Sequence, residues 1–119
     1  MIAARLLRAF RQTRYTAAGV VVRIGRRDRL RPRVAVFITA WNPRSRRMPE
    51  GWNRRMQLRL CERLRRYRTL PADGALHRWH EQHLLVVADP RPVLRLARLF
   101  RQYSVVISRR GQPARLVLL

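Results

Sequence analysis

The sequence predicts a single α+β domain over residues 1–119, in which one mixed sheet of about five or six strands has about three helices packed against it. The chain has 119 residues, enough for one hydrophobic core, and 47% of them are hydrophobic, too many for a disordered tail. Each predicted helix is followed by two predicted strands. The runs VAVFITA and LLVVA are apolar on both faces, which is typical of central strands covered on both sides.

The first predicted element is an N-terminal helix within residues 1–12, with Ile2, Leu6, Leu7 and Phe10 packed inward. This segment is arginine-rich and contains no acid, but it lacks the serines of a transit peptide and the apolar stretch of a secretory signal. We therefore expect a cytoplasmic protein. No run approaches the ~20 apolar residues of a membrane-spanning helix, so we expect no membrane partner.

Two strands are predicted next. The first covers residues 20–24 and is entered through Gly19 and left through Gly25, because glycine accepts the backbone angles of tight turns. A charged turn over residues 26–33 leads to the second strand, which covers residues 34–41 and is continuously apolar.

A polar corner follows this second strand, in the loop over residues 42–51. Asn42 precedes a proline, which favours an extended backbone, and its side chain can bond a nearby backbone group, as can that of Ser45. Two interpretations stay open. Asn42, Ser45 and Asn53 brace the loop onto the next helix, or these residues and Glu81 line one polar ligand pocket at a strand end.

The second predicted helix covers residues 53–67 and has two faces. One face carries four arginines: Arg55, Arg59, Arg63 and Arg66. The opposite, apolar face is made of Met56, Leu60, Cys61, Leu64 and Tyr67. The single cysteine, Cys61, is therefore expected as a small core residue, and its isolation excludes an internal disulfide framework and a multi-cysteine zinc site.

The C-terminal half predicts a short strand closed by Pro71, Asp73 and Gly74, then a second strand, a helix with Asp89 as its N-cap, and two more strands joined by the turn RRGQ. These elements cover residues 68–72, 82–88, 91–102, 104–108 and 114–119.

All three histidines fall in the stretch HRWHEQH. In an extended segment His77, Trp79, Glu81 and His83 share one face, but His77 and His83 are then about 20 Å apart, too far to bind one ion. A tetrahedral site needs three or four converging ligands, so we expect no metal. No glycine-rich phosphate loop, dinucleotide motif or nucleophile elbow occurs, so we expect no cofactor, and any acid–base chemistry would depend on Glu81 or a histidine.

The charge favours a phosphate-bearing partner. There are 28 basic residues, all of them arginine, against six acidic ones, which gives a net charge of +22. The leading hypothesis is low-specificity binding of RNA or DNA phosphates by the four arginines of the second helix, with Trp41, Trp52 and Tyr67 available for base stacking. The alternative is a small enzyme or ligand-binding domain with a polar pocket around Asn42, Asn53 and Glu81, whose arginines reflect codon usage.

Residues 15–119 resemble the bacterial domain-of-unknown-function family 3293. The resemblance is carried by TAWNPRS (39–45), the asparagine at the start of the second helix, WHEQHLLVV (79–87) and FRQYSVVI (100–107). It adds Gln102 to the pocket candidates, and it differs at His83, where the family pattern has serine. The resemblance implies a compact cytoplasmic fold and carries no known activity. We expect Asn42, Asn53 and Glu81 to lie in one neighbourhood.

Overall fold

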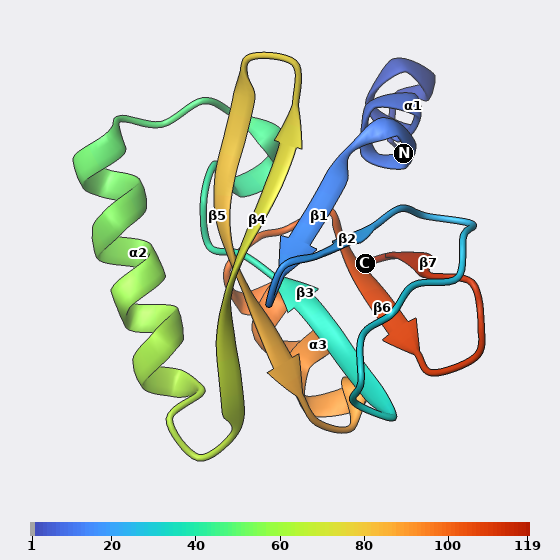
Figure 1. Cartoon of the computed structure of the whole chain (residues 1–119). Helices are drawn as coiled ribbons and strands as arrows, with labels where there is room; N and C mark the ends of the chain where they lie inside the picture. Colours follow the sequence, from blue (N-terminus) through green and yellow to red (C-terminus); the bar gives the residue numbers. More distant parts are fainter. Residues whose placement is uncertain (1) are drawn as a thin grey trace.

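The computed structural model describes residues 2–119 and has α+β architecture, which confirms the predicted class (Figure 1). Its sheet has seven strands rather than about five or six, and every ladder in it is antiparallel. The helices are α1 (Ala4–Gln12), α2 (Glu50–Arg63), α3 (Pro90–Leu99) and the short 3-10 helix η1 (Pro43–Ser45). The strands are β1 (Arg14–Ala17), β2 (Val20–Val22), β3 (Val34–Ile38), β4 (Arg68–Leu76), β5 (Trp79–Val87), β6 (Ser104–Arg109) and β7 (Arg115–Leu118).

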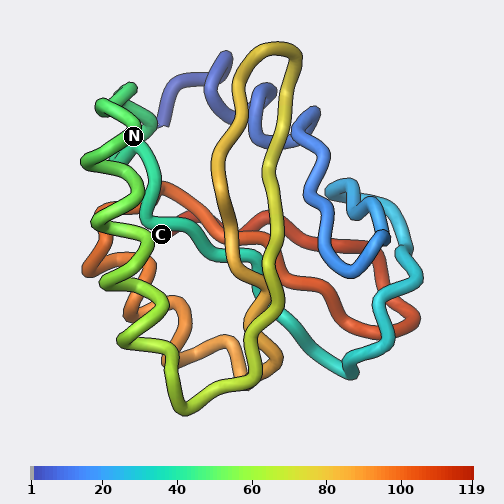
Figure 2. Tube along the Cα trace, turned by 60° about the vertical axis from the view of Figure 1, so that its left-hand side comes forward, coloured from blue at the N-terminus to red at the C-terminus, as the bar shows by residue number. Residues whose placement is uncertain are grey.

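The sheet curls until its two edges meet at one end. Its strand order is β2-β1-β4-β5-β3-β6-β7, so β2 and β7 are the edges. Just past β2, Ile24 pairs with Ala114, and the N–H of Gly25 donates to the carbonyl oxygen of Ala114 at 2.8 Å. The Cα trace shows these segments running side by side (Figure 2). The result is a half-barrel with an outer and an inner face.

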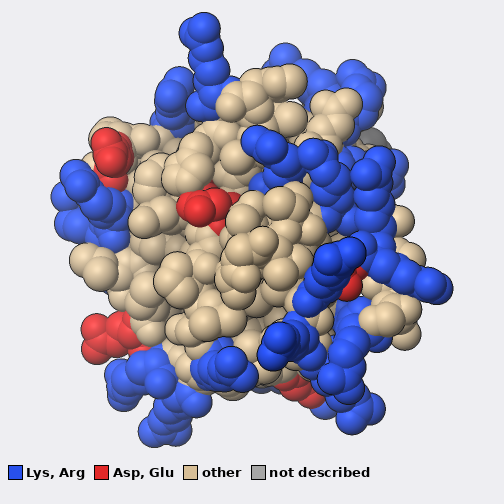
Figure 3. All heavy atoms as spheres, viewed as in Figure 1, with Lys and Arg blue, Asp and Glu red and all other residues tan. Residues whose placement is uncertain are grey.

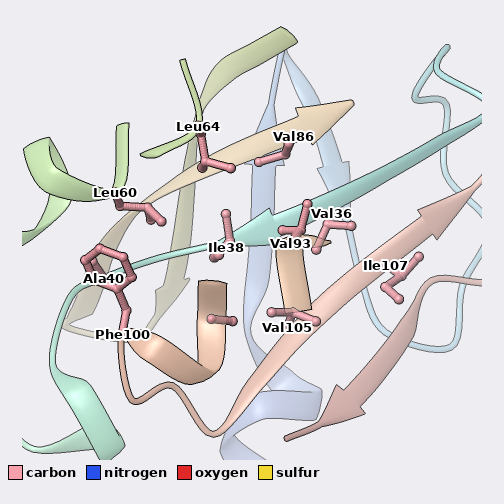
Figure 4. Packing of buried hydrophobic residues seen from close by; sticks show 11 residues of the cluster. Val36, Ile38, Ala40, Leu60, Leu64, Val86, Val93, Phe100, Val105 and Ile107 are labelled. Carbon is pink, nitrogen blue, oxygen red and sulfur yellow. The ribbon is translucent and has the colours of Figure 1, made fainter. Parts of the chain in front are cut away.

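The outer face is covered by α2 and α3. Leu60 of α2 and Leu64, just after the helix, pack on Ile38 and Val86 of the sheet, while α3 contributes Val93 to the same cluster (Figure 4). All five side chains are essentially inaccessible. Burial of a side chain of this size contributes about 1.5–3 kcal/mol. This core therefore fixes β3 and β5, the two strands that carry most of the polar residues discussed below.

The inner face has its own apolar cluster, which closes one end of the half-barrel. Its members include Tyr15, Phe37, Leu85 and Val106 from four strands, together with Leu30 from the loop between β2 and β3. None of the residues of α1 is buried. The inward packing expected for this helix is therefore incomplete, and its side chains form the wall of a cavity instead of a sealed core.

Strand β1 was not predicted from the sequence, and β4 was predicted too short. The expected closure at Pro71, Asp73 and Gly74 is wrong, because β4 runs through all three residues to Leu76. Within β4, the residues that pair with strand β1 are 72–75. Pro71 lies beyond that ladder, where β4 has only β5 beside it, so the missing N–H of proline removes no bond to β1.

The position of Cys61 also differs from the expectation. Cys61 is exposed, because the buried stripe of α2 follows Asn53, Gln57, Leu60 and, just after the helix, Leu64. This stripe has helical spacing, but two of its members are the amides Asn53 and Gln57, which a search for apolar residues alone does not find. Asp89 does cap α3 as expected, accepting from the N–H of Arg91 at 3.0 Å. None of the helices within residues 2–119 is long and apolar enough to cross a membrane.

Candidate functional site

A pocket of about 470 Å³ opens on the inner face of the half-barrel, between α1 and the β4–β5 hairpin. Its walls come from α1, from the inward residues of β1, β3, β4, β5 and β6, and from the loop after β3. The residues with polar side-chain atoms in its lining are Thr13, Tyr15, Thr39, Asn42, Ser45, His77, Arg78, Trp79, Glu81, His83, Gln102, Tyr103 and Ser104. Pocket residues thus come from the whole length of the chain, and the pocket exists only because the sheet curls.

Asn42 and Asn53 form a reciprocal pair at one end of this pocket. The backbone N–H of Asn42 donates to Oδ1 of Asn53 at 2.9 Å, and Nδ2 of Asn53 donates to Oδ1 of Asn42 at 3.0 Å. Oδ1 of Asn42 also accepts the N–H of Met48 at 2.9 Å. Because this oxygen faces two donors, Nδ2 of Asn42 must point the other way, where it donates to Oε2 of Glu81 at 2.9 Å.

The backbone at Asn42 is left-handed rather than extended, which corrects the expectation from the following proline. Its φ is 47° and its ψ is 63°, and Arg44 and Ser45 also have positive φ. Asparagine tolerates this region better than most residues, and the bonds of Asn42 to Asn53 and Met48 hold it there. Concentrated backbone strain of this kind is common at binding and catalytic sites.

Glu81 is a carboxylate without a basic partner in an arginine-rich chain. The ion pairs formed within residues 2–119 are Glu62–Arg65, Asp73–His80 and Asp89–Arg91, and none includes Glu81. Burial raises the pKa of Glu81, although hydrogen bonds from Asn42 and Trp79 act in the opposite direction. One oxygen of the carboxylate is oriented by Asn42, so the group is held in a fixed position at the pocket wall.

His83 is a further titratable group that lines the pocket, and burial lowers its pKa to about 4. It is therefore a neutral imidazole at pH 7. Nδ1 lies 3.1 Å from the carbonyl oxygen of Glu81 and must donate to it, which leaves Nε2 as an unprotonated acceptor. The ring of Tyr15 lies edge-on to that of His83, with the two ring centroids 5.6 Å apart. Burial raises the pKa of the Tyr15 hydroxyl, and the charge of Glu81 acts in the same direction.

Gly74 is expected to be intolerant of any side chain, because the imidazole of His83 lies over it, although its direct partner in the ladder is Glu81. A Cβ at this position would lie 2.7 Å from Cε1 of His83, and the imidazole also packs against the ring of Tyr15. We expect Gly74→Ala to lower the free energy of unfolding by about 1–3 kcal/mol through overpacking. Urea unfolding measures this, and Gly74→Ala in a His83→Ala background should be much less destabilising. An equal loss in both backgrounds would contradict the steric explanation.

The remaining pocket candidates are also near this corner. Nε2 of Gln102 donates to the carbonyl oxygens of Trp41 and Phe100, at 3.1 and 3.3 Å, which leaves its Oε1 free for a ligand. Ser45 lines the pocket, but its hydroxyl has no hydrogen bond to the residues that the structure describes. Sequence reasoning missed Tyr15, Thr39 and His83 as pocket residues. The alternation of Glu81 and His83 along β5 was the available signal for the last of these.

The nucleic-acid candidates lie on a different surface. Arg55, Arg59, Arg63 and Arg66 are all exposed, the first three along α2 and the last in the turn after it. Figure 3 shows that arginine side chains gather around the rim of the viewed face and leave much of its centre free of basic groups. Trp52 is half-buried, and Tyr67 packs against the outer core, so Tyr67 is not free to stack on a base.

Comparison with known proteins gives one match. The family model described as "Protein of unknown function (DUF3293)" matches residues 38–105, more than half of the chain. The matched stretch begins at the end of β3 and includes Asn42, Asn53, Glu81 and Gln102. No curated protein and no solved structure matches the chain.

Proposed function

Since the chain belongs to the DUF3293 family of proteins of unknown function, we propose its function from the pocket: it binds a small organic ligand there, and Glu81 accepts hydrogen bonds from an N–H or O–H donor of that ligand. The observation that carries this proposal is the fixed, unpaired carboxylate. Asn42 and Asn53 orient Glu81, and no arginine within residues 2–119 neutralises it. Such a group stabilises a donor that enters the pocket.

The walls of the pocket support a ligand with an apolar body. Phe10, Phe37 and Trp79 line it beside Leu6 and Val106, and a concave, mostly apolar cavity with a few convergent polar groups is the usual form of a small-molecule site. A buried carboxylate with a raised pKa can also serve as a general base or acid. The proposal therefore includes a small enzyme that uses Glu81, and we expect it to act in the cytoplasm.

The proposal is tested with two aromatic probes that differ only in their polar group. Benzamidine presents two adjacent N–H donors, whereas benzoate presents acceptors. We expect benzamidine to raise the melting temperature of the wild type and of Glu62→Gln, but not of Glu81→Gln, because a ligand stabilises only the state that binds it. Glu62 is the control because its side chain is 75% exposed. Equal effects of benzamidine on Glu81→Gln and wild type would remove Glu81 from the site.

A second candidate function is low-specificity binding of RNA or DNA phosphates. The observation that favours it is the shortage of acids around the arginines: of 28 basic residues, only Arg65 and Arg91 pair with a carboxylate in the described part of the chain. Unpaired guanidinium groups on α2 are free to contact phosphates and release condensed counterions. This surface faces away from the pocket side of β5, because α2 covers the outer face of the sheet.

Nucleic-acid affinity should fall steeply with salt. About five contacts from α2 and the 26–33 loop give a log–log slope of about −4 on duplex DNA, and Arg59→Glu with Arg63→Glu should flatten it by about 2. Fluorescence anisotropy at several salt concentrations measures both quantities. The matched control is Arg95→Glu with Arg98→Glu, which makes the same charge change at exposed positions of α3. Equal losses in the two double variants would exclude α2 as the specific contact face.

A further inference from the structure

The pocket adjoins a second, more open hollow. The two cavities share Leu6, Ala9, Ser45 and Tyr103 as walls, so they are contiguous. The outer hollow has a volume of about 540 Å³ and is additionally lined by Arg5 and Arg44. One ligand can therefore occupy both parts, with its apolar body in the inner pocket and a second group beside the arginines.

Glu81, His83 and Gln102 each offer an acceptor atom to a ligand in the inner pocket. Oε2 of Glu81 already accepts from Asn42, but a carboxylate has about four lone-pair sites, so the group can accept further donors. Nε2 of His83 carries no proton, and Oε1 of Gln102 is left free because its amide nitrogen donates to the backbone. His83 is only 8% exposed, so its imidazole is shielded from solvent at the pocket wall.

Aromatic rings line the same inner pocket. Five of the nine aromatic residues in the chain are in its walls: Phe10, Tyr15, Phe37, Trp79 and Tyr103. Trp79 is 36% exposed and lies under the guanidinium of Arg47, at 5.7 Å from the ring centre. A planar ring system can stack on such side chains, and stacking on aromatic residues is the usual way in which proteins hold an unpaired base.

The outer hollow has the chemistry of an anion site. Neither Arg5 nor Arg44 pairs with a carboxylate within residues 2–119, and Arg78 reaches the edge of the inner pocket. Helix α1 also begins here, with Ala3 at its N-cap and no side chain bonded to its first-turn N–H groups. Guanidinium groups and free helix N–H groups are both suited to phosphate oxygens.

We propose that this continuous cavity binds a guanine 5′-nucleotide, either free or at the 5′ end of a single strand, with the base in the inner pocket against Glu81 and the phosphate beside Arg5 and Arg44. This inference rests on the proposed ligand-binding function and names its substrate class. It requires no glycine-rich phosphate loop, because the arginines take that role.

Guanine is the base whose pairing edge fits an acceptor-only carboxylate. Its N1–H and N2 amino group are adjacent donors, and a carboxylate accepts both at once. Adenine and cytosine each place a ring-nitrogen acceptor beside their amino group, and uracil places its single N–H between two carbonyl oxygens. Each of these bases would therefore set an acceptor against Glu81. Reading an unstacked base by its pairing edge between aromatic side chains is a common mode of single-strand recognition.

Isothermal titration calorimetry at physiological ionic strength tests the base. We expect 5′-GMP to bind, and inosine 5′-monophosphate, which lacks only the N2 amino group, to bind roughly tenfold to a hundredfold more weakly, as for a lost hydrogen bond to a charged group. We expect adenosine 5′-monophosphate to be weaker still. Equal affinities for all three nucleotides and for ribose 5-phosphate would overturn the base assignment, whatever the variants do.

Protein variants test each half of the cavity. Glu81→Gln should weaken 5′-GMP at least tenfold and abolish its preference over inosine 5′-monophosphate, whereas Glu62→Gln should change neither. Arg44→Ala should bring the affinity of 5′-GMP down towards that of guanosine, and Arg95→Ala, at an exposed position of α3 on the outer side of the sheet, should not. Thermal unfolding checks that each variant is folded. A 5′-GMP affinity that survives both Glu81→Gln and Arg44→Ala would overturn the proposal.

Two further comparisons distinguish a free nucleotide from a strand end, and the guanine inference from the proposed ligand-binding function. If the 5′-phosphorylated tetranucleotide pGUUU binds at least tenfold more tightly than 5′-GMP, and pUUUG does not, the ligand is a strand end; if 5′-GMP binds as tightly as pGUUU, it is a free nucleotide. If benzamidine binds in a manner that depends on Glu81 while 5′-GMP does not bind, the guanine inference fails and the proposed function stands. If neither binds, both fail.

Discussion

Replacing Asn53 with alanine is expected to lower the free energy of unfolding by about 3–5 kcal/mol, a large part of the stability of a domain of this size. The change removes the acceptor of the Asn42 backbone N–H at 2.9 Å and the donor to Oδ1 of Asn42 at 3.0 Å. It also removes a weaker bond, at 3.3 Å, to the carbonyl oxygen of Met48. The Asn42 N–H is then left buried and unpaired, which is the most expensive consequence.

Urea unfolding followed by tryptophan fluorescence measures this loss, since Trp41 and Trp52 flank the corner. Arg54→Ala is the matched control, because it truncates the neighbouring, exposed position of the same helix and should change stability by less than about 0.5 kcal/mol. Asn53→Ala should also disorder the Asn42 amide and with it the orientation of Glu81. A loss below about 1 kcal/mol would contradict the view that the asparagine pair holds the strained loop together.

The helices and the central strands could be predicted because their signals are local. The arginine-rich helix and the capped α3 follow from helical periodicity and from Asp89 before a proline, and β3 and β5 from their apolar runs. Asn42, Asn53 and Glu81 were singled out by turn chemistry and by the family-like pattern, and the structure places their side chains in one hydrogen-bonded chain.

The curl of the sheet and the pocket could not be predicted, because they depend on pairings between distant segments. Strand β1 is only four residues long, RYTA, and it becomes a strand by pairing with β4. Asp73 and Gly74 are ordinary turn formers, yet here Gly74 is a strand residue that leaves space for the ring of His83. No local pattern distinguishes a glycine required by a distant imidazole from one required by a turn.

Protonation of Glu81 and protonation of His83 have opposite consequences for stability. The folded-state pKa of Glu81 is raised by burial, so acidification favours the folded state as this carboxylate takes up its proton. Exchanging Glu81 for glutamine should therefore not destabilise the fold at neutral pH, even though the proposed ligand is lost. A charged group that is retained at the expense of stability is typical of functional sites.

His83 should make the protein lose about 3 kcal/mol of stability as the pH falls from 6.5 to 4. Its folded-state pKa is lowered from 6.5 to about 4 by burial. Above pH 6.5 the imidazole is neutral in both states and the shift contributes nothing. Between the two values the unfolded chain binds a proton that the folded chain does not, so acid drives unfolding. The change should amount to about 1.4 kcal/mol per pH unit across this window.

Urea unfolding at several pH values between 4 and 7 tests this dependence in the wild type, in His83→Gln and in His77→Gln, the same exchange in the β4–β5 turn. His83→Gln should be less stable at pH 7, since it disturbs the contacts to Tyr15 and Glu81, but its stability should fall much less with acid. The difference between wild type and His83→Gln in the pH dependence of the free energy of unfolding reports on His83 alone, because both proteins retain Glu81. Parallel pH profiles for wild type and His83→Gln would show that folding does not lower the pKa of His83, which would contradict its burial as a neutral imidazole.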